Sequence, residues 1–384
     1  MTERICITGC GVVSAIGVGQ AANLDHLLHA RSGVGPVRYV EGWSEEFPVG
    51  EVPLSNAGLA ALCGAPAEWP RTTLLSIVAL QEALSQAGLA DGSDMRLIGG
   101  TTVGGMDLTE RIFPDYSPNH GCGASTDLAA LYVGGFEDAT TLSTACSSAA
   151  NAFIFGANLI RTGQCERVVV GGSESLSLYH LNGFNSLMIL DRQPCRPFDA
   201  TRAGLNLGEG AAYLVLETAD SARKRGVKPL AWLSGFGNAC DAFHQTASSE
   251  NGEGAFLAMS KALAMAALKP SDIDYINAHG TGTPNNDASE STALKRVFAE
   301  GIPPVSSTKA FTGHTTSASG SIEAVFCILA LQHGFLPPQL NWQTPDPSCV
   351  TPVTSVLNKP VRHILSNAFG FGGNDSSLIF SAYE

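Results

Sequence analysis

The chain has 384 residues, of which 44% are hydrophobic and only 15% charged, and its formal net charge at pH 7 is -13. This acidic balance argues against nucleic acid as a partner, because nucleic-acid-binding surfaces are basic. The longest apolar run, residues 324–331, is far shorter than the roughly 18 residues of a membrane span, so no span is expected. The low charged fraction favours buried helices and a large subunit interface.

Short strand-like runs alternate with helix-length patterns along the chain. Runs typical of buried strands occupy residues 5–9, 96–103, 139–142, 167–172, 211–217, 230–235, 273–278 and 377–382. Helical patterns occupy residues 72–88, 147–161, 254–267, 288–299 and 318–333. This alternation predicts an α/β fold built in layers.

The polar stretch at residues 218–226 is the best boundary between two halves, which gives domains at residues 1–225 and 226–384. A turn rich in Gly, Ser and Thr opens a buried helix at Cys146 in the first half, and another opens one near Ser317 in the second. This similarity between the two halves predicts that one layered unit is duplicated.

One cysteine lies in the setting of a sharp turn. Residues 143–149 read STACSSA, follow a strand-like run and precede a buried helical pattern. The free N–H groups and the dipole of a helix N-terminus favour the thiolate form of a cysteine. Cys146 is therefore the candidate nucleophile, and neighbouring N–H groups could hold an oxyanion.

Two histidine motifs lie far downstream of that cysteine. His279 is part of NAHGTGT at residues 277–283, and His314 ends STKAFTGH at residues 307–314. Each follows a strand-like run and is surrounded by Gly and Thr, which is typical of a site built on strand ends and loops. A cysteine with distant histidines indicates a catalytic nucleophile only if the fold brings them together.

The chain has ten cysteines at irregular spacing. Because no export signal is evident, we expect reduced thiols in a cytoplasmic protein. No CxxC pair or Cys/His cluster has metal-ligand spacing, and His120 with Cys122 would supply only two ligands, so no metal site is expected.

Motifs along essentially the whole chain resemble those of the β-ketoacyl-ACP synthases of the thiolase superfamily, in the subgroup with a Cys-His-His triad. The matching segments are residues 171–174, 196–202, 208–210, 241–246, 279–283, 309–314 and 367–373. The resemblance implies a thiolase-like α/β fold, a duplicated αβαβα arrangement in five layers. It also implies a decarboxylative Claisen condensation of malonyl-ACP with an acyl group carried on Cys146.

The resemblance also implies roles for individual residues. His279 and His314 would support decarboxylation and stabilise the enolate. The backbone N–H groups of Cys146 and Phe371 would form the oxyanion hole. Phe371 is flanked by glycines, which allow loop motion, and is expected to act as a mobile gate.

Other implied roles concern support, substrate binding and docking. Lys309 would pair with Glu323 and hold the His314 loop, or such a buried pair could be purely structural. Substrates would arrive on the phosphopantetheine of ACP without a separate cofactor, in a channel lined by Thr246, Thr281 and Thr283. The acidic carrier would need a local basic patch, for which the candidates are Arg71, Arg192 and Arg196.

The sequence departs from the housekeeping condensing enzymes in three loops. The family's GFGGTN becomes GFGGND at residues 370–375, and its GHxxGAAG becomes GHTTSASG at residues 313–320. The segment before the nucleophile is shortened and carries HGCG at residues 120–123. These features are most similar to ketosynthases of bacterial aryl polyene clusters, which work beside a chain-length-factor homologue. We therefore expect a homodimer or a heterodimer with such a homologue, and leave fatty acid synthesis open as the pathway.

Three other functions were compared with the condensing enzyme. A chain-length-factor subunit would lack the nucleophile, whereas Cys146 and both histidines are present. A thiolase would carry a second cysteine in a Cys-x-Gly setting near the C-terminus, where residues 368–373 have none. A papain-like hydrolase would show its own cysteine signature, which is absent, and would leave the second histidine idle.

Overall fold

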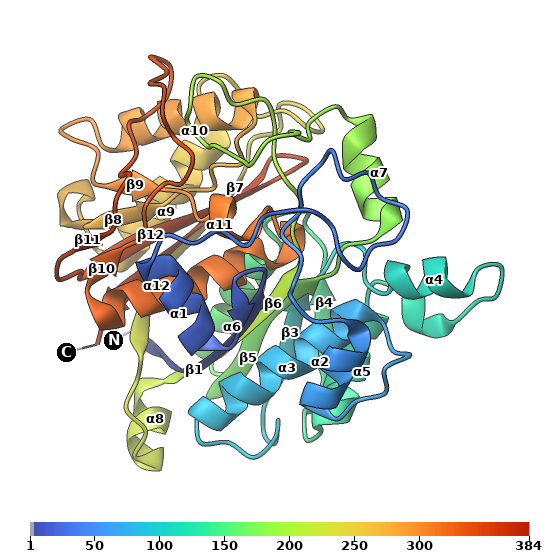
Figure 1. Cartoon of the computed structure of the whole chain (residues 1–384). Helices are drawn as coiled ribbons and strands as arrows, with labels where there is room; N and C mark the ends of the chain where they lie inside the picture. Colours follow the sequence, from blue (N-terminus) through green and yellow to red (C-terminus); the bar gives the residue numbers. More distant parts are fainter. Residues whose placement is uncertain (1–3, 384) are drawn as a thin grey trace.

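The computed structural model describes residues 4–383, and it arranges helices on and between the two parts of one long mixed β-sheet (Figure 1). The first set of strands is β1 (Ile5–Ser14), β3 (Leu97–Gly100), β4 (Ala139–Leu142), β5 (Arg167–Glu174) and β6 (Gly210–Thr218). The second set is β7 (Ala231–Cys240), β8 (Tyr275–Asn277), β9 (Val305–Ser306), β12 (His363–Gly370) and β13 (Asn374–Ala382).

The two sets of strands share one topology. The sheet order is β4-β3-β5-β6-β1-β7-β13-β12-β8-β9. When the strands of each set are numbered one to five in chain order, both sets have the same arrangement: the third strand lies at the outer edge, followed inward by the second, fourth, fifth and first. In both sets the fifth strand is antiparallel to its neighbours and the outer three are parallel. The sets meet where β1 pairs antiparallel with β7. This repeat confirms the predicted duplication, while the domain division between residues 225 and 226 stays a prediction.

Five layers follow from the way the helices cover this sheet. α3 (Arg71–Gln86) packs on β1 and β6, and α9 (Glu253–Ala266) packs in the same way on β7 and β13. Between the two strand sets lie α6 (Ser148–Arg161) and α12 (Ser319–His333). Residues 319–331 of α12 are all buried, as expected for a helix that is apolar on every side. A Cβ on Gly320 would lie 2.9 Å from the backbone N of Ala150, so the two central helices cross at close range.

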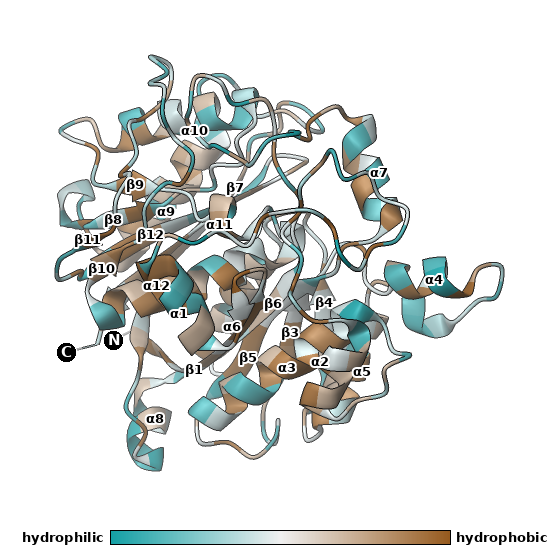
Figure 2. Cartoon of the chain, viewed as in Figure 1, coloured by the Kyte–Doolittle hydropathy of each residue, from teal (hydrophilic) through white to brown (hydrophobic). Residues whose placement is uncertain are grey.

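The remaining elements cover the edges and the ends of the layers. The helices are α1 (Gln20–Leu28), α2 (Asn56–Cys63), α4 (Met106–Ile112), α5 (Ala124–Val133), α7 (Leu178–Ser186), α8 (Ala219–Arg225), α10 (Pro284–Val297) and α11 (Lys309–Thr312). The short strands are β2 (Gly17–Val18), β10 (Phe335–Leu336) and β11 (Leu357–Asn358), and three 3-10 turns are η1 (Pro118–His120), η2 (Pro270–Asp272) and η3 (Thr316–Ala318). Figure 2 shows the charged α8 as hydrophilic and much of the central sheet as apolar. Among residues 4–383, no helix combines the length and the apolarity of a membrane span.

Helix positions were predicted better than their ends. The five expected helices correspond to α3, α6, α9, α10 and α12. α10 begins four residues earlier than predicted, because Pro284 occupies its first turn, where a missing N–H costs nothing. The expected strand at residues 96–103 is restricted to Leu97–Gly100, and neither α7 nor β12 was predicted.

Candidate active site

Cys146 lies on the turn between the edge strand β4 and the central helix α6, as the sequence predicts. Ala145 has a φ of 52°, a left-handed conformation that costs energy for a residue with a Cβ. Ser148 holds this turn, because its Oγ accepts from the Thr144 N–H at 2.9 Å and donates to the Ala145 carbonyl at 2.6 Å. The thiol is only 4% exposed and lies beside the N-terminus of α6.

The fold brings both predicted histidines to this cysteine. His279 follows β8, and His314 follows α11 in a segment that pairs with Leu207. Nε2 of His314 lies 3.1 Å from Sγ of Cys146. The ring of His279 stands edge-on to that of His314, with 5.3 Å between centroids. All three side chains line one pocket of about 350 Å³.

Two buried carboxylates hold the histidine loops. Glu290 of α10 accepts the backbone N–H groups of His279 and Gly280 at 2.9 and 2.8 Å, and the side chain of Asn367 at 3.0 Å. This carboxylate fixes the backbone of the His279 loop without contacting the ring. Only one feature of the sequence indicated this role of Glu290, namely that it lies on the inner face of the helix predicted at residues 288–299.

The second carboxylate, Glu323, pairs with Lys309 as the resemblance implies. Nζ of Lys309 lies 2.6 Å from Oε1 of Glu323, and both side chains are almost completely buried. Burial raises the pKa of Glu323 to about 7, although the Lys309 charge opposes this rise. The pair sits at the two ends of the segment that carries His314.

Burial favours the uncharged forms of the two histidines and of the thiol. It lowers the pKa values of His279 and His314 well below their ordinary range, and the Lys309 charge lowers them further. Burial also raises the pKa of Cys146 to about 11, which outweighs the opposing effects of Lys309 and of the Phe371 backbone N–H. The expectation of a resting thiolate is therefore wrong, because desolvation exceeds the stabilisation available at the helix terminus.

Phe371 lies on the loop between β12 and β13 and lines the same pocket. Its ring stacks on Phe184 of α7, with 5.9 Å between centroids and 19° between planes. Gly372 and Gly373 follow at φ values of 82° and 76°, which side chains rarely adopt. The three predicted channel residues also line this pocket: Thr246, Thr281 and Thr283.

Comparisons with known proteins identify the family. Residues 67–222 match the family model described as "Beta-ketoacyl synthase, N-terminal domain", and residues 230–343 match the corresponding C-terminal domain. Nodulation protein E of Rhizobium meliloti is 34% identical over 99% of both chains. A 3-oxoacyl-[acyl-carrier-protein] synthase 2 from Synechocystis is 31% identical over 100% of this chain and 99% of its own. The chain belongs to the β-ketoacyl synthase family.

Solved structures of ketosynthases share the whole fold of this β-ketoacyl synthase. The ishigamide ketosynthase/chain length factor superposes with a TM-score of 0.92 at 29% identity, covering 100% of both chains. The ketosynthase ApeO, in complex with its chain length factor ApeC from Xenorhabdus doucetiae, gives 0.87 at 30% identity over 99% of this chain and 98% of that one. These likenesses confirm the predicted thiolase-like fold and an acyltransferase that forms C–C bonds.

The structure corrects one of the three arginines suggested for docking. Arg71 is 5% exposed, and its guanidinium donates to both carboxylate oxygens of Glu209, so it is internal to the synthase. Arg196 is mostly buried and pairs with Asp191 at 2.9 Å. Arg192 alone of the three extends into solvent, with 72% of its side chain exposed.

The hydrogen bonds that converge on Asn374, next to the Phe371 loop, were not predicted from the sequence. The Asn374 side-chain oxygen accepts hydrogen bonds from Ser147, Asn151 and Asn238 at 3.0, 2.8 and 2.9 Å. It thereby ties the loop to the start of the nucleophile helix. The change from the family's Thr to Asn at this position was visible, but its partners come from two distant segments, the start of α6 and β7.

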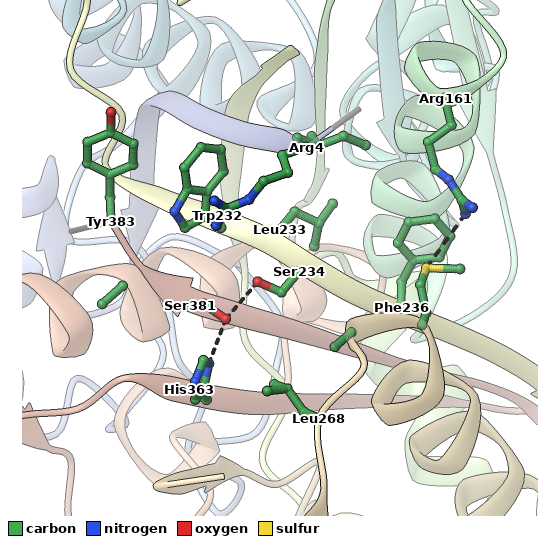
Figure 3. A pocket seen from close by; sticks show the side chains of 14 residues that line it. Arg4, Arg161, Trp232, Leu233, Ser234, Phe236, Leu268, His363, Ser381 and Tyr383 are labelled. Atoms are coloured by element: carbon green, nitrogen blue, oxygen red, sulfur yellow. Dashed lines mark hydrogen bonds between the residues drawn. The ribbon is translucent and has the colours of Figure 1, made fainter. Parts of the chain in front are cut away.

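A second pocket, of about 560 Å³, shares no lining residue with the cysteine pocket (Figure 3). Its polar side chains contact one another, because Ser381 accepts from Ser234 at 2.7 Å and lies 2.8 Å from Nδ1 of His363. The guanidinium of Arg4 stacks 3.8 Å over the ring of Trp232. Among residues 4–383, no cysteine lines this pocket.

The expected absence of a metal site concerns His120 and Cys122. The thiol of Cys122 donates to the carbonyl of Thr101 at 3.2 Å, and the His120 ring stands edge-on to Tyr116. Within residues 4–383, no group of three or more His, Cys, Asp or Glu side chains could hold a metal ion.

Proposed function

We propose that this β-ketoacyl synthase condenses malonyl-ACP with an acyl group held as a thioester on Cys146. The contact that carries the proposal is the 3.1 Å between the Cys146 thiol and Nε2 of His314, with His279 beside it in the same pocket. Both substrates would arrive on the phosphopantetheine arm of the carrier, so no separate cofactor is needed. The protein would act in the cytoplasm.

In the first half-reaction, Sγ of Cys146 attacks the carbonyl carbon of acyl-ACP while its proton passes to Nε2 of His314. The backbone N–H groups of Cys146 and Phe371 both lie near enough to Sγ to lower the thiol pKa, so they can donate to the oxyanion that forms. The C–S bond to the carrier then breaks, and the leaving thiolate takes the proton from His314.

In the second half-reaction, the C–C bond to the malonyl carboxylate breaks and CO₂ leaves. The electron pair forms an enolate, whose oxygen accepts hydrogen bonds from Nε2–H of neutral His279 and His314. The enolate carbon attacks the thioester on Cys146, a C–C bond forms and the C–S bond breaks. The Cys146 thiolate recovers a proton, so one proton is consumed for each CO₂ released.

The test combines intact-mass analysis with single-turnover assays. Acyl-ACP should add one acyl mass at Cys146, and Cys146→Ala should lose this adduct, while the exposed Cys240 provides the control Cys240→Ala. His279→Ala should slow malonyl-ACP decarboxylation and spare acylation, whereas His314→Ala should slow both. An adduct that survives Cys146→Ala would overturn the proposal.

The synthase would work as a homodimer or as a heterodimer with a chain-length-factor-like homologue. The edge strand β4 would lie at the dimer interface. Within residues 4–383, β4 is paired on one side only, and the neighbouring α5 and α6 expose Leu131 and Phe155. An unpaired edge beside apolar side chains needs a cover. Leu131→Asp with Phe155→Asp should halve the mass seen by light scattering, from twice 39.9 kDa, whereas Leu62→Asp on α2 should not.

For carrier docking, Arg192 remains as the exposed candidate of the three arginines. Arg192→Glu should raise the KM for acyl-ACP several-fold at low salt, because charge steering acts mainly on association. Arg223→Glu on α8 removes an equally exposed charge and should leave KM unchanged.

Aryl polyene synthesis is the pathway that we propose in place of housekeeping fatty acid elongation. The altered loops at residues 313–320 and 370–375 and the likeness to ketosynthases solved with a chain length factor support it. Competition between polyenoyl-ACP and saturated acyl-ACP for Cys146, read as adduct mass, tests it. Preferential loading of the saturated chain would favour fatty acid elongation instead.

A further inference from the structure

The Nδ1 atom of His314 contacts a hydroxyl group. Oγ of Ser319 lies 3.0 Å from this nitrogen, and Oγ1 of Thr315 lies 3.2 Å from the same Oγ. Both hydroxyls are almost completely buried, and neither makes a further hydrogen bond within residues 4–383.

A hydroxyl differs from a backbone group as a partner for an imidazole nitrogen. A backbone N–H can only donate, which would fix the ring proton on Nε2, and a backbone carbonyl would fix it on Nδ1. The hydroxyl of Ser319 can donate or accept, and Thr315 can follow in either direction. His314 therefore keeps a hydrogen bond at Nδ1 whichever nitrogen carries the proton.

The two half-reactions require opposite protonation states of Nε2 of His314. During acylation Nε2 must be free to accept the thiol proton of Cys146, so Nδ1 carries the ring proton and donates to Ser319. During decarboxylation Nε2 must carry a proton and donate to the enolate oxygen, so Nδ1 accepts from Ser319. Burial keeps the His314 ring neutral between the two steps, so only one proton is available to serve both.

We propose that Ser319 is a positioning residue that supports both neutral tautomers of His314, and so lets one histidine act first as a base and then as a hydrogen-bond donor. The inference rests on the proposed function. The change of tautomer moves one proton from Nδ1 to Nε2. Water that enters the pocket after the first carrier leaves exchanges this proton, and the ring charge does not change.

Three variants test the proposal through the two half-reactions separately. Ser319→Ala should slow both single-turnover acylation and malonyl-ACP decarboxylation about tenfold, the usual scale for a lost buried hydrogen bond. Ser319→Thr keeps a hydroxyl and should restore both rates to within a few-fold. Ser321→Ala is the matched control, because this buried hydroxyl of the same helix bonds the Ala318 carbonyl and should leave both rates unchanged.

Selective ¹⁵N labelling of histidine gives a second readout that needs no variant at Ser319. In the resting protein the His314 shifts should report a proton on Nδ1, because Nε2 accepts from the Cys146 thiol. Alkylation of Cys146 removes that donor, and the proton should move to Nε2. A His314→Ala sample identifies the signal among the nine histidines.

The outcomes separate this inference from the proposed function. If condensation survives Cys146→Ala, the function fails and the inference falls with it. If condensation needs Cys146 but Ser319→Ala keeps both rates, slows one half-reaction only, or behaves like Ser321→Ala, the function stands and the inference is overturned. Identical His314 shifts before and after alkylation would also overturn it.

Discussion

Replacing Asp375 with Asn should stabilise the protein, and by more at alkaline than at acid pH. Asp375 lies on β13 directly after the Phe371 loop, is 5% exposed and accepts no hydrogen bond from residues 4–383. The side chain of Asp241 lies beside it, since a Cβ on Gly254 would be 2.2 Å from Oδ2 of Asp375 and 2.9 Å from Cβ of Asp241. Burial, followed by the charges of Asp241 and Glu290, raises the pKa of Asp375 to about 8.

The sign of the effect follows from proton linkage. The unfolded carboxyl of Asp375 ionises near its ordinary value of 3.8, whereas the folded one keeps its proton up to about pH 8. The stability linked to this group is therefore fully present below about pH 4 and is lost as the pH rises to about 8. At about 1.4 kcal/mol per pH unit, the full span corresponds to roughly 6 kcal/mol.

Urea unfolding of the wild type and Asp375→Asn at pH 5 and pH 8 measures this effect. The advantage of the variant should grow by about 3 kcal/mol between the two pH values. Asp241→Asn is the matched control and should destabilise at both, because its carboxylate accepts from Ser249 N–H, Ser249 Oγ–H and Gly254 N–H. Parallel stability curves for wild type and Asp375→Asn would refute the reasoning.

Three further outcomes are expected. Arg71→Ala should lower the free energy of unfolding by about 3–5 kcal/mol, because it leaves the Glu209 carboxylate buried and unpaired; a change confined to the KM for ACP would contradict this. Alkylation of Cys146 by iodoacetamide, followed in a Cys240→Ala background, should still accelerate between pH 8 and 10, because the thiol pKa is about 11; a plateau near pH 8 would indicate a resting thiolate. Phe371→Ala should reduce discrimination among acyl-ACPs with a melting temperature within a few degrees of wild type, since the half-exposed ring makes few core contacts.

Local features of the site were predictable because they are contiguous in the sequence. The turn at Cys146 lies between a strand and a helix that can each be recognised from a few residues, and the structure places all three where the sequence indicated. The contact between Cys146 and His314 spans 168 positions. Spacing alone could not establish it, and it came only from the resemblance to a known family.

The errors arose where a partner lies far away in the chain. An arginine at the start of a helix has the same local sequence whether it faces solvent or a buried acid, and Arg71 faces Glu209, 138 positions away. The thiolate expectation failed for a related reason. A helix N-terminus is a local feature of the sequence, but the depth of burial of Cys146 depends on layers contributed by both halves.

The charge of Lys309 acts on all three reactive groups in the site. It lowers the pKa values of His279, His314 and Cys146, which keeps the histidines neutral and eases loss of the thiol proton. Lys309→Met removes this charge at similar length. Glu323 is left alone, but with a pKa already raised to about 7 it can take up a proton instead of remaining a buried anion.

The pKa of His314 should then rise, and the acid limb of the acylation rate should move to higher pH, because only neutral imidazole accepts the thiol proton. Glu323→Gln is the matched control: it keeps the lysine charge and should leave the limb in place. Single-turnover acylation of Cys146 between pH 4.5 and 8 measures both variants. If the limb of Lys309→Met coincides with that of the wild type, the lysine does not set the charge state of His314, and its part in the site is confined to holding the loop.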